Sequence, residues 1–147
     1  MRPSRFYIAS LGCPKNTVDS NAMGVLLQRS GYEPTLDSSQ ADLVIVNTCG
    51  FIEQARAESL ETLEDLAASL TESQHLVAAG CWAQRDPDAI IGAVPRIDAV
   101  LGTRSWAQIV PLAEHLLAAV GEPTQRLIEE RLSTMPEEAH APGYVIS

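Results

Sequence analysis

Three cysteines are the residues of this chain with the clearest chemical potential. Cys13, Cys49 and Cys81 each follow a short apolar run typical of a β-strand, and each precedes a segment with helical periodicity. If the three runs are parallel strands of one sheet, all three thiols lie at its carboxyl edge, where open α/β sheets bind their ligands. Three thiolates that meet in one crevice predict a metal centre.

The spacing of the cysteines indicates how they would meet. Cys49 lies 36 residues after Cys13, and Cys81 lies 32 residues after Cys49. Each interval matches one β-α-β unit, so the fold must bring the thiols together. No close cysteine pair exists to form a zinc ribbon, a zinc finger or a C-x-x-C redox site. An odd number of cysteines also argues against a disulfide framework.

Two metal centres suit three thiolates. Iron–sulfur clusters are held by cysteine thiolates, and three ligands suit a [4Fe-4S] cluster with one iron open to a substrate or a sulfur atom. Helix N-termini after the strands would add partial positive charge and N–H donors around the anionic cluster. A zinc ion with three cysteines and one water is the alternative. Any single cysteine could be a buried core residue, but three at one predicted edge favour a site.

Three polar residues beside the cysteines are weaker candidates for contacts around the metal. Lys15 could tune a cluster or contact an anionic co-substrate, although a solvated lysine is the usual case. Asn16 and Asn47 could orient the loops that carry the cysteines, although asparagine is also common at caps and turns for its own reasons.

The order of predicted elements supports this placement of the cysteines. Four strands are predicted, over residues 5–11, 42–48, 75–79 and 97–101. The second lacks alternation, which is typical of a strand buried on both faces of a parallel sheet. Repeated strand–helix alternation with right-handed crossovers predicts a three-layer α/β/α sandwich with a mainly parallel, four- to five-stranded sheet.

Capping signals place the helices between the strands. Asn16 is predicted to cap the first helix, and the longest helix is predicted over about residues 51–70. Asp86, followed by a proline, is predicted to begin a short helix after the third strand. Ser105 begins a capping-box pattern for the last helix, although Pro111 should kink that helix or delay its start.

Length, charge and hydropathy limit the domain organisation and the partners. The 147 residues suffice for one ordinary domain, which we expect over residues 1–121, with residues 122–147 as a linker toward a further domain. A net charge of −9 and scattered basic residues argue against nucleic-acid binding. No apolar stretch approaches the roughly 18 residues of a membrane span, and no secretory signal is recognisable. We therefore expect a cytoplasmic protein.

Four blocks of the sequence match a known family, namely residues 10–16 with Asp19 and Ser20, residues 46–52 with Ala55, Glu58 and Ser59, residues 80–85, and residues 95–98 with Gly102. Together they resemble the N-terminal domain of the radical-SAM methylthiotransferases. The blocks Cys-Pro-Lys-Asn and Thr-Cys-Gly-Phe-Ile are similar to the branch that methylthiolates an aspartate of the twelfth small-subunit ribosomal protein. The alternative branch, which modifies adenosine in transfer RNA, typically has Cys-Gln-Met-Asn.

The resemblance implies a role for the chain. It implies that Cys13, Cys49 and Cys81 hold one auxiliary [4Fe-4S] cluster that takes part in sulfur delivery. It also implies a second cluster, on a C-x-x-x-C-x-x-C motif in a radical-SAM domain, that cleaves S-adenosylmethionine. We find no such motif in residues 1–147 and expect the chain alone to be inactive. The implied partners are a small-subunit ribosomal protein and a sulfur donor. A stand-alone, non-catalytic module that binds a metal or a partner is the competing hypothesis.

Overall fold

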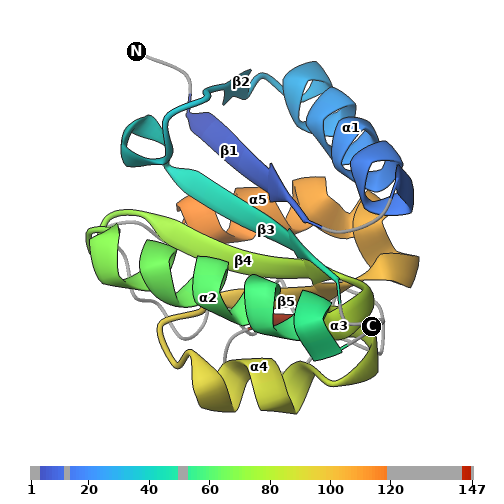
Figure 1. The fold of residues 1–147 in the computed structure, drawn as a ribbon. Helices are drawn as coiled ribbons and strands as arrows, with labels where there is room; N and C mark the ends of the chain where they lie inside the picture. The colour runs from blue at the N-terminus through green and yellow to red at the C-terminus, as the bar shows by residue number, and fades with distance from the viewer. Residues whose placement is uncertain (1–3, 12–13, 50–52, 119–143, 147) are drawn as a thin grey trace.

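The chain forms a parallel sheet with helices on both faces (Figure 1). The computed structural model describes residues 4–11, 14–49, 53–118 and 144–146. Within these ranges the sheet has six strands in the order β2-β1-β3-β4-β5-β6, and every neighbouring pair is parallel. The strands are β1 (Arg5–Ser10), β2 (Glu33–Pro34), β3 (Leu43–Thr48), β4 (His75–Gly80), β5 (Ala99–Gly102) and β6 (Tyr144–Ile146).

Five α-helices and two 3-10 helices are described between these strands. The α-helices are α1 (Pro14–Arg29), α2 (Glu53–Ser69), α3 (Cys81–Arg85), α4 (Pro87–Ala93) and α5 (Ile109–Ala118). The 3-10 helices are η1 (Ser38–Gln40) and η2 (Thr103–Gln108). Among the described helices, none has both the length and the apolar character that a membrane span requires.

Two apolar cores lie on the two faces of the sheet and confirm the predicted three-layer sandwich. On one face, Met23 of α1 and Leu112 of α5 pack with Ile45 of β3. On the other face, Leu63 of α2 packs with Val46 of β3, together with residues of α3 and α4. All six residues of β3 are buried, because helices cover it on both sides. This burial explains why its sequence shows no polar alternation.

Several element boundaries differ from the sequence-based expectations. We predicted that Asn16 caps the first helix, and this prediction is wrong. The helix begins at Pro14, so Asn16 lies within its first turn. Proline is favoured at the first helical position because its missing N–H has no helical acceptor there. At the last helix, the predicted delay is confirmed: η2 precedes α5, and Pro111 lies in the first turn of α5.

The expected linker is described only in part. Of residues 122–147, those from 144 to 146 form β6, which pairs with β5. Residues 122–143 and 147 lie outside the described ranges. The role of residues 122–147 as a linker therefore stays a prediction.

Aspartates fix the amino edge of the sheet. The carboxylate of Asp42 accepts a hydrogen bond from the Arg5 N–H at 2.9 Å, and that of Asp98 accepts one from the Leu76 N–H at 2.8 Å. Each aspartate immediately precedes one strand and binds the start of its neighbour. These bonds satisfy N–H groups at which the ladder begins, and they help to set the strand register.

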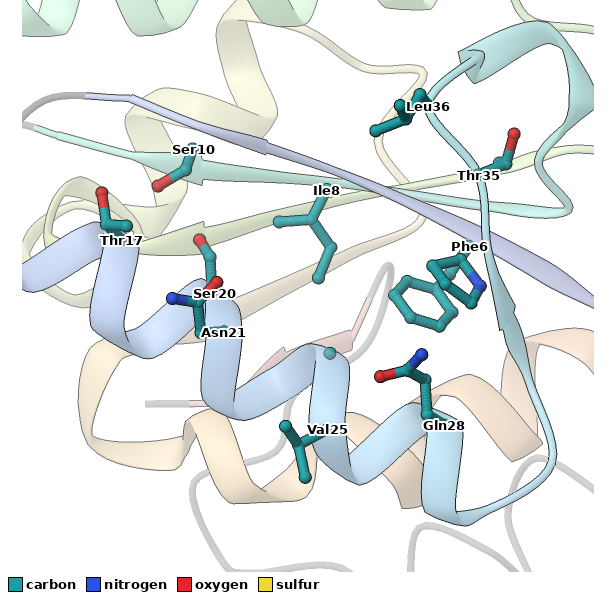
Figure 2. Close-up of a pocket in the computed structure, with 12 residues that line it drawn as sticks. Phe6, Ile8, Ser10, Thr17, Ser20, Asn21, Val25, Gln28, Thr35 and Leu36 are labelled. Carbon is teal, nitrogen blue, oxygen red and sulfur yellow. The ribbon is translucent and has the colours of Figure 1, made fainter.

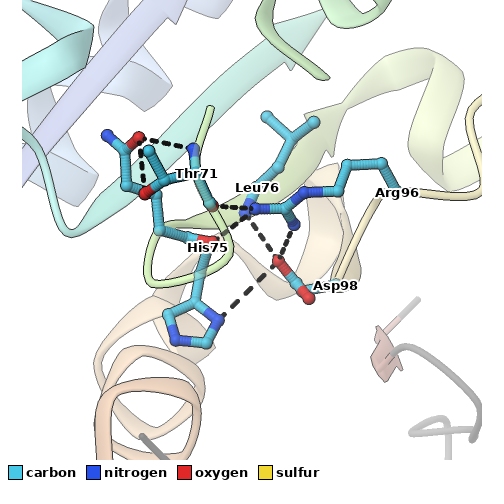
Figure 3. A network of polar contacts seen from close by, with 6 residues as sticks. Thr71, His75, Leu76, Arg96 and Asp98 are labelled. Carbon is cyan, nitrogen blue, oxygen red and sulfur yellow. Dashed lines mark hydrogen bonds and ion pairs between the residues drawn. The ribbon is translucent and has the colours of Figure 1, made fainter. Parts of the chain in front are cut away.

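Arg96 extends the Asp98 contacts into a network (Figure 3). Its Nη1 lies 2.8 Å from Asp98 Oδ2, and its Nη2 donates to the carbonyls of Thr71 and Gln74 at 2.8 and 2.6 Å. His75 Nδ1 lies 3.7 Å from the same carboxylate oxygen. Burial alone would raise the pKa of Asp98, but His75, the Leu76 N–H and Arg96 outweigh it, so this pKa is lowered.

We predict that Asp98→Asn destabilises the fold by about 1–2 kcal/mol at neutral pH, because the Arg96 guanidinium loses its carboxylate partner. Because the pKa of Asp98 is lowered in the folded state, its negative charge stabilises the fold fully at pH values above 3.8, the ordinary pKa of this group. This stabilisation is lost as the pH falls through the folded-state pKa. Urea unfolding of wild type and Asp98→Asn across this pH range should show that the difference in their free energies of unfolding becomes smaller as the pH falls. Asp65→Asn, at an exposed position of α2, is the control. A difference that is independent of pH would contradict the electrostatic explanation.

Candidate metal centre at the carboxyl edge

The register of β3 and β4 brings two of the predicted ligands to one place. Thr48 pairs with Gly80 at the carboxyl ends of these adjacent strands. Cys49 and Cys81 are the next residues, so both cysteines directly follow the carboxyl ends of adjacent strands, as predicted. Cys49 is buried and Cys81 partly buried, and neither forms a disulfide.

The third predicted ligand, Cys13, lies outside the described residues. Its strand does end at the same edge, since Ser10 of β1 pairs with Asn47 and the Leu11 N–H donates to the Asn47 carbonyl at 3.1 Å. α1 then begins at Pro14, directly after Cys13. The path of the chain on both sides of Cys13 is therefore compatible with the expected position, which stays a prediction.

Ser59 holds the backbone at Cys49 through one hydroxyl. The Cys49 N–H donates to Ser59 Oγ at 3.0 Å, and this Oγ donates to the Cys49 carbonyl at 3.2 Å. Ser59 has no exposed surface and lies on the core-facing side of α2, one turn before Leu63. Sequence reasoning gave it no role. The available signal was a serine at an otherwise apolar position of an amphipathic helix.

Gly80 allows β3 and β4 to approach closely next to the two cysteines. Its φ of +99° lies in the region that favours glycine. A Cβ atom here would collide with Asn47 Oδ1 and the Thr48 carbonyl, and would lie 3.0 Å from Thr48 N. Thr48 Oγ1 in turn donates to the Ala79 carbonyl at 2.5 Å. The absence of a side chain at Gly80 therefore lets the backbone of β3 lie close to the residue before Cys81.

Asn47 connects the end of β3 to α1. Its Nδ2 donates to Ser20 Oγ at 2.9 Å, and both residues are buried. Asn47 thus joins the strand that ends before Cys49 to α1, and its influence on the loop at Cys49 stays a prediction. The side chains of Lys15 and Asn16 lie outside the described parts, so their contacts around a metal stay predictions.

Two arginines that sequence reasoning missed lie at the same edge. Arg56, in the first turn of α2, and Arg85 of α3 line a small cavity of about 160 Å³ together with Trp82 and Asp86. Guanidinium groups are strong donors to anionic ligands. This cavity offers cationic groups next to the helix that Cys81 begins, a role that we had considered for Lys15.

The residues present suit a thiolate-bound centre. Two sulfur donors lie at neighbouring strand ends, Cys49 in a buried position and Cys81 in a partly buried one. Soft thiolate ligands favour iron–sulfur clusters and zinc. Within the described ranges, no three cysteine, histidine, aspartate or glutamate side chains form a metal-binding group, and these ranges include only two of the three predicted ligands.

Comparisons with known proteins give the family. Residues 5–102 match the model of the uncharacterized protein family UPF0004. A ribosomal protein uS12 methylthiotransferase RimO from Roseiflexus sp. (strain RS-1) is 46% identical over 112 residues, which cover 76% of this chain and 24% of that protein. The protein of the same name from Acetivibrio thermocellus is 46% identical over 108 residues, which cover 73% of this chain and 24% of that protein.

A third relative matches over a longer stretch. The RimO protein of Trichlorobacter lovleyi is 39% identical over 139 residues, which cover 88% of this chain and 31% of that protein. The chain thus spans about a quarter of the length of the curated relatives that it matches. It belongs to the UPF0004 family, the N-terminal domain of the methylthiotransferases, and resembles the members that are named for ribosomal protein uS12.

Proposed function

We propose that this chain is the auxiliary-cluster domain of a methylthiotransferase that modifies an aspartate of ribosomal protein uS12. In this proposal Cys13, Cys49 and Cys81 hold one [4Fe-4S] cluster. The observation that carries it is the pairing of Thr48 with Gly80, which puts two cysteines from distant parts of the sequence at adjacent strand ends. The names of the relatives support the substrate.

The protein groups around the cysteines have defined tasks in this proposal. When bound, the cluster supplies an iron site with an open position for sulfur delivery. Ser59 fixes the backbone of one ligand, and Gly80 leaves room for Asn47 and Thr48 of the neighbouring strand directly before Cys81. Arg56 and Arg85 provide positive charge for an anionic sulfur donor or co-substrate.

The complete reaction requires a radical-SAM domain with its own cluster and S-adenosylmethionine. This chain spans about a quarter of the length of its relatives. We propose that its cluster takes part in sulfur delivery and that the chain alone is inactive. Because its substrate is part of the ribosome, the proposed location is the cytoplasm. The net charge of −9 makes direct binding to nucleic acid unfavourable.

Anaerobic reconstitution with iron and sulfide tests the cluster. We expect about four irons per chain with the visible absorption of a [4Fe-4S] cluster. Cys13→Ala, Cys49→Ala and Cys81→Ala should each lose most of the iron, since each removes one of three ligands. The exposed Ser30→Ala is a control that should retain it. Circular dichroism establishes that each variant is folded.

Two results would overturn this proposal. One is stoichiometric zinc with no iron after incubation with both metals. The other is full iron binding by a folded variant that lacks any one of the three cysteines.

A further inference from the structure

A groove runs along the outer edge of β1, between this strand and α1 (Figure 2). Its volume is about 500 Å³, within the range of ligand-binding clefts. One side is formed by Phe6, Ile8 and Ser10 of β1, and the opposite side by residues of α1 that include Val25. The segment that follows β2 bounds the groove near Phe6. The groove thus extends along β1 to Ser10, at the carboxyl edge.

The outer edge of β1 is only partly paired. β2 pairs with Arg5 and Phe6, and the Thr35 N–H donates to the Phe6 carbonyl at 2.9 Å. Within the described ranges, no strand pairs with this edge beyond Phe6. Successive residues of a strand direct their N–H and C=O groups to opposite neighbours, so Ile8 and Ser10 direct theirs to the same side as Phe6. These backbone groups face the groove.

Exposed apolar side chains gather at this groove. The described residues include three large hydrophobic side chains that are exposed, namely Val18 at 66%, Val25 at 45% and Leu36 at 100%. Val25 and Leu36 line the groove, and Val18 lies two turns before Val25 on the same side of α1. Clustered apolar exposure of this kind marks interaction sites in soluble proteins.

The groove contains no charged lining residue. All twelve residues that line it are uncharged, although 20% of the chain is charged and its net charge is −9. A charged occupant would lose its water without gaining an ionic partner, which is costly. Hydroxyl and amide groups of Ser10, Thr17, Asn21 and Gln28 instead suit a neutral, hydrogen-bonding occupant.

We propose that this groove binds a short, uncharged, extended segment of a partner protein as an added strand on β1. Backbone groups of Ile8 and Ser10 provide the ladder, and Val25 and Leu36 contact an apolar side chain of the bound segment. β2 already occupies the start of this edge, so a single peptide strand fits beside it more easily than the β1 edge of a second copy. The proposal does not depend on the cluster and can fail separately from it.

The test uses the full chain and fluorescent eight-residue peptide libraries. One library contains only uncharged residues, a second has a central Asp or Lys, and a third is uncharged but N-methylated at alternate positions. We expect polarisation to show binding of the first library, with the other two weaker by about tenfold or more. Bound peptide should slow amide hydrogen exchange at Ile8 and Ser10.

Variants at exposed positions separate groove binding from general adhesion. Val25→Asp and Leu36→Asp should weaken binding about tenfold or more and leave the fold intact, because both side chains are exposed. Ala57→Asp, on the exposed part of α2, should have no effect. Equal binding of the three libraries, no binding of any, or protection at other strands would overturn the proposal. Self-association in ultracentrifugation that these same variants abolish would also overturn it, in favour of a second copy.

Discussion

Replacement of Gly80 by alanine is expected to destabilise the folded chain by about 2–5 kcal/mol. Two effects add together at this position. The φ of +99° is unfavourable for any residue with a Cβ atom, and the new atom would overlap Asn47 Oδ1 and the Thr48 carbonyl. Both obstacles belong to a buried strand in the centre of the sheet, so neither can move freely. Urea unfolding of wild type and variant gives the difference in free energy.

Gly31 and Gly92 provide matched controls for these two effects. Gly31 has the same φ of +99°, but a Cβ atom there would meet nothing within 4 Å. Gly31→Ala should therefore cost only the conformational term, about 1–2 kcal/mol. Gly92 lies in α4 with open space around it, so Gly92→Ala should be neutral or stabilising by up to about 1 kcal/mol. If Gly80→Ala lowers the free energy of unfolding by no more than Gly31→Ala does, the inference that β3 and β4 approach closely beside the cysteines is wrong.

The central strands were predictable because their sequences carry the physical requirement of burial on both faces. Four runs of apolar residues gave β1, β3, β4 and β5 within two residues at each end. Strand–helix alternation then determined that these strands run parallel, and therefore that Cys49 and Cys81 leave the sheet at the same edge. Asp86 also caps α4 as predicted, with its side chain accepting from the Ala89 N–H at 3.2 Å.

Elements that depend on tertiary contacts were not predictable from local sequence. β2 contains only Glu33 and Pro34, both exposed, and it is a strand only because it pairs with β1. α3 starts at Cys81 without a side-chain cap, so no capping signal was present. The groove along β1 was also missed, because it arises where a partly covered sheet edge lies next to α1.

The site shows the same division between local and tertiary information. Cysteine positions at strand ends follow from spacing, whereas the hydrogen bonds from Ser59 to Cys49 join residues ten positions apart through the packing of α2 on β3. Arg56 and Arg85 likewise meet at one cavity because two helices begin at the same edge. Residue types indicated the candidate ligands, but the groups that hold the backbone at these residues required the three-dimensional arrangement.

The Ser59→Ala variant is expected to lose about 2–4 kcal/mol of stability, because both backbone groups of Cys49 would remain buried without their partner. Ser69→Ala is the matched control in the same helix, since Ser69 is exposed and its hydroxyl donates to the Leu66 carbonyl at 3.2 Å. Its removal should change stability by less than about 0.5 kcal/mol. Urea unfolding measures both differences.

A second measurement shows whether Ser59 positions Cys49 as well as stabilising the fold. Cys49 is only 5% exposed, so its thiol should react slowly with a disulfide reagent in the folded wild type. If the hydroxyl holds the loop in place, Ser59→Ala should accelerate the labelling of Cys49 under conditions in which the variant stays folded. Mass spectrometry of the peptide that contains Cys49 measures the labelling rate. Labelling of Cys81 should change less, because the Ser59 hydroxyl forms its hydrogen bonds with the backbone of Cys49. Equal rates at Cys49 in Ser59→Ala, Ser69→Ala and wild type would show that helix packing alone positions this cysteine.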